Sequence, residues 1–209
     1  MALARHANVD YRSWRTYAQV GLWRKQAELR ALAEASTVVR QFLPAIPSSM
    51  LQTEEYARQV LTPTVPGDIS WNREQAVRAR MEMQRALEDV SRAFVFLMPE
   101  HAIRWQRADP ATMADQCRHL AEVSTRPNVR VAIIPREKRV SASPLHVFAV
   151  FDDRLVLVEL FSGEVALRDP QDVDYHLSLF QFFLGHALVD DEARDLLGSV
   201  AAEFASMCD

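Results

Sequence analysis

A histidine and a glutamate stand where a β-hairpin would bring them together. The strand-like segments 145–151 and 154–161 flank Asp152-Asp153, which predicts a two-residue turn. That turn places His146 directly opposite Glu159, so their side chains would touch. A carboxylate beside an imidazole favours its charged form, which suits proton transfer or ligand binding. The alternative is a partly exposed cross-strand ion pair with a structural role only.

A second carboxylate follows a strongly apolar segment. Glu100 comes directly after the run 93–98 and Pro99, and the carboxyl ends of strands are where α/β sheets tend to bind ligands. The alternative is an acid at a helix N-terminus, where the helix dipole favours negative charge. Glu100, His146 and Glu159 are therefore the candidate catalytic residues.

Two amides and one phenol are candidate ligand-binding groups. Gln84 and Gln116 lie on neighbouring predicted helices and could both contact a polar ligand, although glutamines more often face solvent. Tyr56 could line a pocket, and core packing is the alternative for so large a side chain. Cys117 lies on the apolar side of its predicted helix, which indicates an inert, buried thiol.

Three arginines repeat at seven-residue spacing. Arg78, Arg85 and Arg92 would share one face of a predicted helix, and a basic helical stripe is typical of contacts to a nucleic-acid backbone. Acidic residues alternate with them along the segment, so a solvated face with intrahelical ion pairs is the alternative.

Several kinds of site lack their sequence signals. The six histidines show no metal-ligand spacing, and the chain holds only five glycines and no glycine-rich phosphate loop. Zinc-protease and hydrolase motifs are also missing. We therefore expect no metal and no cofactor, while catalysis of another kind stays open.

Composition restricts the possible partners and compartment. With 209 residues, 49% of them apolar, the chain can bury a core of its own. Residues 150–209 hold three arginines and thirteen acids, which argues against wrapping nucleic acid. No apolar run has the length of a signal peptide or a membrane span, and the two cysteines lie far apart. These features predict a cytoplasmic protein without membrane contact.

The predicted elements indicate a mixed α+β domain. Its centre is a mixed sheet of about five strands, which ends in a C-terminal antiparallel meander and is flanked by helices. A long amphipathic helix over Tyr11–Phe42 precedes it, so we expect a helical extension over 1–42 and a single domain over 43–209. The other predicted helices begin at Thr53, Ser70, Asp109, Asp169 and Asp190, with that from Ser70 running through Val90, and the predicted strands cover 93–98, 129–134, 145–151, 154–161 and 164–167.

Several segments, in this order, resemble a known family. They are Phe42-Leu-Pro44, Met50-Leu-Gln-Thr-Glu-Glu-Tyr-Ala-Arg58, Arg80-Met-Glu-Met-Gln84, Glu100 with Ile103 and Arg104, Met113–Leu120, Arg126–Pro135 and Glu159. Together they resemble the domain of unknown function found behind the XRE-type helix-turn-helix of actinomycete transcriptional regulators, over roughly Ala27–Phe204. Ser48 and Ser49 replace the proline-glycine pair of that family, and Met83 replaces an arginine.

The resemblance implies a sensor-like role. The family's DNA-binding bundle would need about sixty further residues, and residues 1–21 cannot form it, so direct DNA binding is not expected. The first hypothesis is a regulator-associated domain that binds a small molecule or a protein partner. The second is a small transferase or synthase of specialised metabolism, with an aminoacyl-tRNA as a conceivable donor and RNA as a partner. The third is an adaptor or dominant-negative subunit that forms a homodimer through residues 11–42.

Overall fold

The centre of the molecule is a seven-stranded sheet with the order β1-β7-β6-β5-β2-β3-β4. The computed structural model describes residues 9–62 and 72–208. Strands β2, β3 and β4 are parallel, whereas β5, β6, β7 and β1 continue the sheet in antiparallel order. The predicted mixed α+β class is confirmed. The strands are β1 (Val9–Ser13), β2 (Val38–Phe42), β3 (Ala93–Pro99), β4 (Val129–Ile134), β5 (Val147–Phe151), β6 (Leu155–Leu160) and β7 (Gly163–Leu167).

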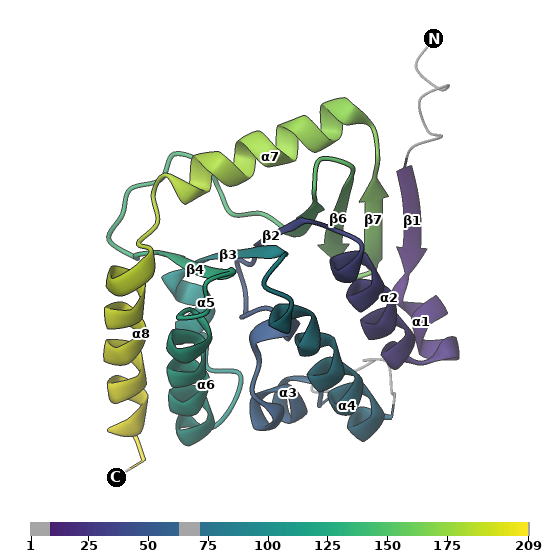
Figure 1. Cartoon of the computed structure of the whole chain (residues 1–209). Helices are drawn as coiled ribbons and strands as arrows, with labels where there is room; N and C mark the ends of the chain where they lie inside the picture. The colour runs from purple at the N-terminus through teal and green to yellow at the C-terminus, as the bar shows by residue number, and fades with distance from the viewer. Residues whose placement is uncertain (1–8, 63–71, 209) are drawn as a thin grey trace.

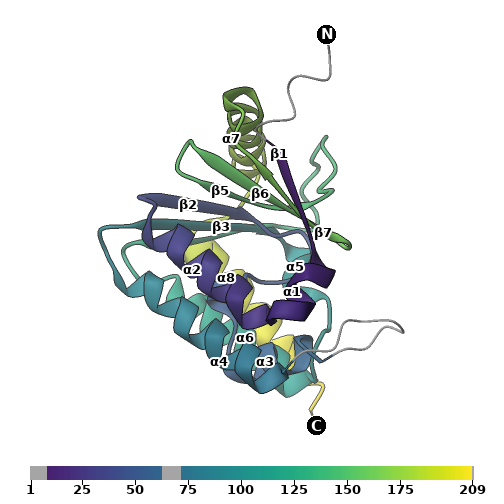
Figure 2. The same cartoon turned by 90° about the vertical axis from the view of Figure 1, so that its right-hand side faces the viewer.

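Helices lie on both faces of the sheet, but far more of them lie on one face than on the other. Helix α7 alone crosses one face, and most of the other helices gather on the opposite face (Figures 1 and 2). The helices are α1 (Trp14–Val20), α2 (Leu22–Glu34), α3 (Glu54–Val60), α4 (Arg73–Met83), α5 (Glu100–Arg104), α6 (Pro110–Val123), α7 (Pro170–Leu184) and α8 (Asp190–Ala205), with short 3₁₀ turns η2 (Ser49–Leu51) and η3 (Gln84–Glu88). In the described part of the chain, no helix has the length and apolar character needed to cross a membrane.

Helix starts follow the local sequence closely. Thr53, Asp109 and Asp169 each occupy an N-cap, and the side chain of each accepts a hydrogen bond from a backbone N–H in the first turn. Pro110 and Pro170 occupy the first helical positions, where a missing N–H costs nothing. These starts were predicted and are confirmed, because capping depends only on neighbouring residues.

Strand alternation divides the apolar residues between two cores. In β6, Val156 packs in the core beneath α7, whereas Leu157 packs in the larger core on the other side of the sheet. Phe42 stacks on Phe183 of α7 with ring centroids 4.5 Å apart. Polar residues of β6 and β7 on the face of the sheet opposite Val156 therefore point toward the helices of the larger core.

The long helix predicted over 11–42 is wrong. Gly21 adopts a φ of 96°, which ends α1 and separates it from α2. Beyond α2, Thr37, Val38 and Val39 have β-branched side chains, and β2 begins at Val38. Residues 9–42 thus contribute two strands to the central sheet, which has seven strands rather than about five. They do not form a helical extension.

The helix predicted over Ser70–Val90 is also shorter than expected. Its predicted start at Ser70 lies outside the described residues, and Asn72 caps α4. The α-helix ends at Met83 and continues as the 3₁₀ turn η3, and Arg92 lies beyond both. Seven-residue spacing keeps side chains on one face only along a continuous α-helix.

Candidate functional site

A cavity of about 740 Å³ lies on the side of the sheet opposite α7. One wall is the sheet itself, and the others come from α1, α2, α4 and the loop that contains η2. Volumes of this order are typical of pockets for small ligands. The lining residues include Trp14, Tyr17, Lys25, Gln26, Leu29, Gln41, Leu43, Ile46, Ser48, Gln52, Leu61, Arg80, Val147, Ala149, Leu157, Glu159 and Glu164.

Residues 9–25, here called the N-terminal segment, close one side of this cavity. Strand β1 pairs with β7, and the Gly163 backbone approaches so closely that a Cβ there would lie 2.2 Å from the Arg12 carbonyl oxygen. The Trp14 indole donates a hydrogen bond of 2.8 Å to the carbonyl of Leu160. The N-terminal segment therefore packs directly against β6 and β7, which form part of the cavity wall.

Glu159 lies on the floor of the cavity. Its side chain is open to the cavity's solvent, yet protein surrounds it closely enough that desolvation raises its pKa above the ordinary carboxylate value. Lys25 and Arg80 lower the pKa, and Glu164 raises it further. No hydrogen bond or ion pair joins Glu159 to another side chain of the described residues.

Glu164 stands directly opposite Glu159 in the β6–β7 register. Unlike Glu159 it is fully paired: Lys25 forms an ion pair with it, and both side chains are only 3% exposed. The Tyr17 hydroxyl lies 2.9 Å from Glu164 Oε1 and 3.0 Å from Glu28 Oε2. Lys25 therefore compensates one of the two neighbouring carboxylates and leaves the other free.

Arg80 is the second buried cation of the cavity. It is 8% exposed, and its Nη1 donates a hydrogen bond of 2.6 Å to Gln52 Oε1. Burial lowers its pKa to about 10, a value at which the guanidinium is still charged at neutral pH. Its Nε has no hydrogen-bond partner, and no carboxylate of the described residues lies within ion-pair distance. Arg80 therefore has free donor capacity.

The two predicted ligand-binding glutamines hold the cavity wall instead of facing the cavity. Gln116 donates from Nε2 to the Leu51 carbonyl at 2.7 Å and accepts at Oε1 from the Thr53 N–H at 2.8 Å. Gln84 donates to the Gln52 carbonyl at 2.7 Å. Both amides are thereby used in fixing the loop around η2, and neither lines the cavity.

Tyr56 is part of the core and not of the cavity. Its side chain is fully buried, its hydroxyl has no partner among the described residues, and burial raises its pKa. Cys117 is also buried, as predicted, and burial raises its thiol pKa to about 12.

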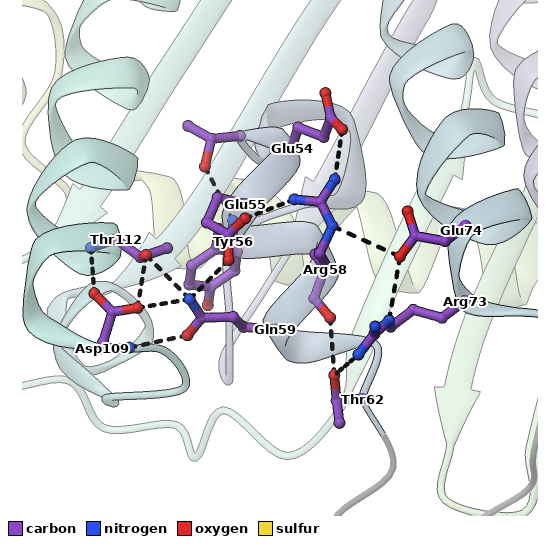
Figure 3. Close-up of polar contacts among 11 residues, drawn as sticks. Glu54, Glu55, Tyr56, Arg58, Gln59, Thr62, Arg73, Glu74, Asp109 and Thr112 are labelled. Atoms are coloured by element: carbon purple, nitrogen blue, oxygen red, sulfur yellow. Dashed lines mark hydrogen bonds and ion pairs between the residues drawn. The ribbon is translucent and has the colours of Figure 1, made fainter.

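Helix α3 is tied to its neighbours by a polar network on the outer surface (Figure 3). Gln59 Nε2 donates to Asp109 Oδ2 at 2.6 Å, which joins α3 to the start of α6. Arg58 donates to Glu54 and Glu55 at 2.7 and 2.6 Å and lies 3.6 Å from Glu74 of α4. Because the loop around η2 leads into α3, this network also helps to position the cavity wall.

Glu100 has a structural environment. It is 2% exposed, accepts a hydrogen bond of 2.5 Å from Arg104 Nε and one of 2.9 Å from the Arg136 backbone N–H. Arg104 also pairs with Glu203 of α8. Glu100 does not line the cavity. Its contacts join the start of α5 to the end of β4 and, through Arg104, to α8.

The predicted contact between His146 and Glu159 is wrong. The turn between β5 and β6 contains three residues, because Phe151 pairs with Leu155 and Val147 lies opposite Glu159. Asp152 opens this turn with a φ of 53°, and its carboxylate accepts from the Thr37 and Val38 N–H groups. The longer turn shifts the register by one residue, and His146 lies exposed before β5.

The three arginines do not share a helical face. Arg78 lies on α4 and Arg85 on η3, and both are exposed. Arg92 lies past the end of η3 and pairs with Asp89 at 3.0 Å. Among the described residues there is also no group of histidine, cysteine and acidic side chains that could hold a metal ion.

Of the candidate residues named from the sequence, Glu159 is the one that lines the cavity. Sequence reasoning missed Lys25, Gln52 and Glu164 and gave Arg80 no role of its own. An acid in an otherwise apolar strand was a usable signal for Glu164, since β7 alternates toward a buried face. No comparable signal marks Lys25, because its partner lies 139 residues away.

Residues 26–199 match the family described as a domain of unknown function (DUF5753). The chain belongs to this family. The match begins after Lys25, so the cavity contacts of the N-terminal segment precede the DUF5753 region. Among curated proteins, none matches the sequence.

Several solved structures are similar to this chain. NucT from Helicobacter pylori is similar, with a TM-score of 0.50 and 10% identity over 86% of this chain and 97% of NucT. A phospholipase D family member, Nuc from Salmonella typhimurium, has a TM-score of 0.43 and 8% identity over 79% and 90% of the two chains. The archaeal chromatin protein TrmBL2 has a TM-score of 0.44 and 8% identity over 91% of this chain and 56% of its own. At 10% identity the likeness to NucT concerns the fold alone.

Proposed function

We propose that this DUF5753 chain is a small-molecule-binding domain and that its ligand occupies the cavity beside the N-terminal segment. The observation that carries the proposal is the presence of free polar groups in a cavity of about 740 Å³. Glu159 and Arg80 both lack an ion-pair partner among the described side chains, whereas Glu100 is paired. Charged groups of a cavity that have no ion-pair partner in the protein are expected to have a ligand or water as partner.

The lining also provides apolar surface. Leu29, Leu43, Ile46, Val147 and Leu157 face the same space as the charged groups. A pocket that is mostly apolar with a few convergent polar groups is typical of small-molecule sites. This supports the sensor-like role that the resemblance to regulator-associated domains led us to expect.

The test is ligand detection with a blocked cavity as comparison. Native mass spectrometry of freshly purified protein, followed by a thermal-shift screen of metabolites, should find a compound that raises Tm. The variant Ala149→Phe fills the cavity from β5 and should abolish the shift, whereas Ala111→Phe, at an exposed position of α6, should retain it. If the bound compound stabilises both variants equally, the ligand does not occupy this cavity.

A second candidate function is catalysis by Glu159. Glu159 lines the cavity, and a raised carboxyl pKa is a property that a general acid requires near neutral pH. In that case Glu159→Gln should keep substrate binding but lose turnover. The adaptor hypothesis has less support, because the free helix over 11–42 on which it depended is not formed in the described residues. The transferase hypothesis with an aminoacyl-tRNA donor also has less support, because Arg78, Arg85 and Arg92 do not share one helical face.

A further inference from the structure

The floor of the cavity carries two carboxylates, Glu159 and Glu164, and only Glu164 forms an ion pair with another described residue. Glu159 and Glu164 are directly opposed across β6 and β7 and point to the same face of the sheet. Like charges at such positions are about 5 Å apart at Cβ and destabilise each other. Lys25 forms its ion pair with Glu164 and acts on Glu159 only from beyond ion-pair distance.

Arg80 carries the opposite charge but forms no ion pair with Glu159. It is more than nine-tenths buried, its only hydrogen bond to a described side chain goes to Gln52, and its Nε has no partner. The distance between the Arg80 guanidinium and Glu159 exceeds the limit of an ion pair, although each influences the other electrostatically. The cavity thus contains one free carboxylate and one free guanidinium, separated from each other.

Gln26 adds an independent, unpartnered group. It lines the cavity, is 4% exposed, and its Oε1 accepts no hydrogen bond from the described residues. An unpaired acceptor and a free carboxylate that line the same cavity favour a ligand group with several N–H donors, since an ammonium carries three. A guanidinium with free donors favours a carboxylate, which matches its planar geometry.

We propose that the ligand is a zwitterion of the amino-acid type with an apolar side chain, whose ammonium group binds Glu159 and whose carboxylate binds Arg80. This inference rests on the proposed function of the cavity. A single dipolar molecule would compensate both isolated charges, whereas a purely cationic or anionic ligand would leave one of them without a partner. The apolar body of the ligand would contact Leu29, Leu43 and Leu157.

The experiment uses matched probes that differ only in their charged groups. L-leucine, L-phenylalanine and L-tryptophan are each compared with the corresponding amine and the corresponding carboxylic acid by isothermal titration calorimetry. We expect at least one amino acid to bind, and to bind at least about tenfold more tightly than either single-charge analogue, because each charge-assisted contact contributes about that factor.

Variants then assign each charge to its partner. Glu159→Gln should weaken amino-acid binding about tenfold and leave binding of the carboxylic acid unchanged. Arg80→Lys keeps the charge but loses the planar fork, and should weaken binding of both the amino acid and the carboxylic acid. Glu137→Gln and Arg78→Lys, at exposed positions away from the cavity, are the matched controls. Circular dichroism confirms that each variant is folded.

Three results would overturn the inference. The first is that no amino acid binds. The second is that an amine or acid alone binds as tightly as its amino acid, and the third is that Glu159→Gln has no effect. If another small molecule from the thermal-shift screen still binds in a manner that Ala149→Phe abolishes, the zwitterion inference fails while the proposed function stands. If nothing binds in either experiment, both fail.

Discussion

At the scale of single residues, hydrogen-bond satisfaction separates structural groups from candidate functional ones. Glu100 and Gln116 have partners on each polar end, and both join backbone segments. Glu159 and Arg80 have free capacity inside a cavity. All four could be noticed in the sequence, but their partners decide which of them can still bind something else.

Replacing Glu159 by glutamine should stabilise the ligand-free protein at neutral and higher pH. Because the folded-state pKa is raised, the folded protein holds a proton that the unfolded chain has released, so wild-type stability falls as pH rises through that window. The groups that face Glu159 are Lys25 on α2, Glu164 on β7 and Arg80 on α4.

Urea unfolding of Glu159→Gln and wild type between pH 4 and 8 measures this effect. The advantage of the variant should shrink as pH falls below the ordinary pKa of a glutamate, about 4.3, where the carboxyl is protonated in both states. Glu137→Gln removes an exposed charge and should show no such trend. A constant difference across the pH range would argue against a raised pKa.

At the scale of elements, the loop around η2 depends on side chains from distant helices. Gln116 of α6 and Gln84 of η3 bind its backbone, and Gln52 within it binds Arg80. Helix α3, which follows directly, is joined to α4 and α6 by the network around Arg58 and Gln59 (Figure 3). Three of the segments that resemble the family, Met50–Arg58, Arg80–Gln84 and Met113–Leu120, thus meet at one wall of the cavity.

Gln116→Ala should destabilise the protein by about 2–4 kcal/mol, because it leaves two backbone groups of the loop without partners in a buried place. Equilibrium urea unfolding measures the loss. Gln181→Ala removes an exposed amide from α7 and should change stability by less than about 0.5 kcal/mol. Equal effects of the two substitutions would show that the amide of Gln116 does not hold the loop.

At the scale of the whole molecule, the N-terminal segment and the DUF5753 region share one cavity. The segment pairs with the far edge of the sheet through β1, and Lys25 joins it to Glu164 in the interior. Trp14 and Tyr17 add contacts to Leu160 and Glu164. The cavity is therefore bounded by parts of the chain that lie far apart in sequence.

Lys25→Met should destabilise the fold by about 3–5 kcal/mol, because it leaves Glu164 buried without its cation and directly opposite Glu159. The double variant Lys25→Met/Glu164→Met should recover most of that loss, and thermal unfolding of the set gives the coupling energy. Arg30→Met breaks an exposed ion pair with Glu34 and should cost less than about 0.5 kcal/mol. Additive effects of the two methionine substitutions would contradict a coupled pair.

The sequence by itself determined the features that depend on near neighbours. The caps at Thr53, Asp109 and Asp169 and the strand Val129–Ile134 were predicted with their observed bounds or starts, because capping and alternation are local properties. The family resemblance and the choice of Glu159 as a site residue were also available from the residues alone.

Only the tertiary structure decided what lies beside Glu159. A three-residue turn, stabilised by Asp152 binding to the start of β2, moved the register away from His146. The incorporation of residues 9–13 and 38–42 into the sheet brought Lys25 to Glu164, its partner 139 residues away. Such contacts depend on how strands pair and helices pack across the whole chain. Hydrophobic periodicity indicates which face of a strand is buried, but neither the partner strand nor the length of the turn that sets the register.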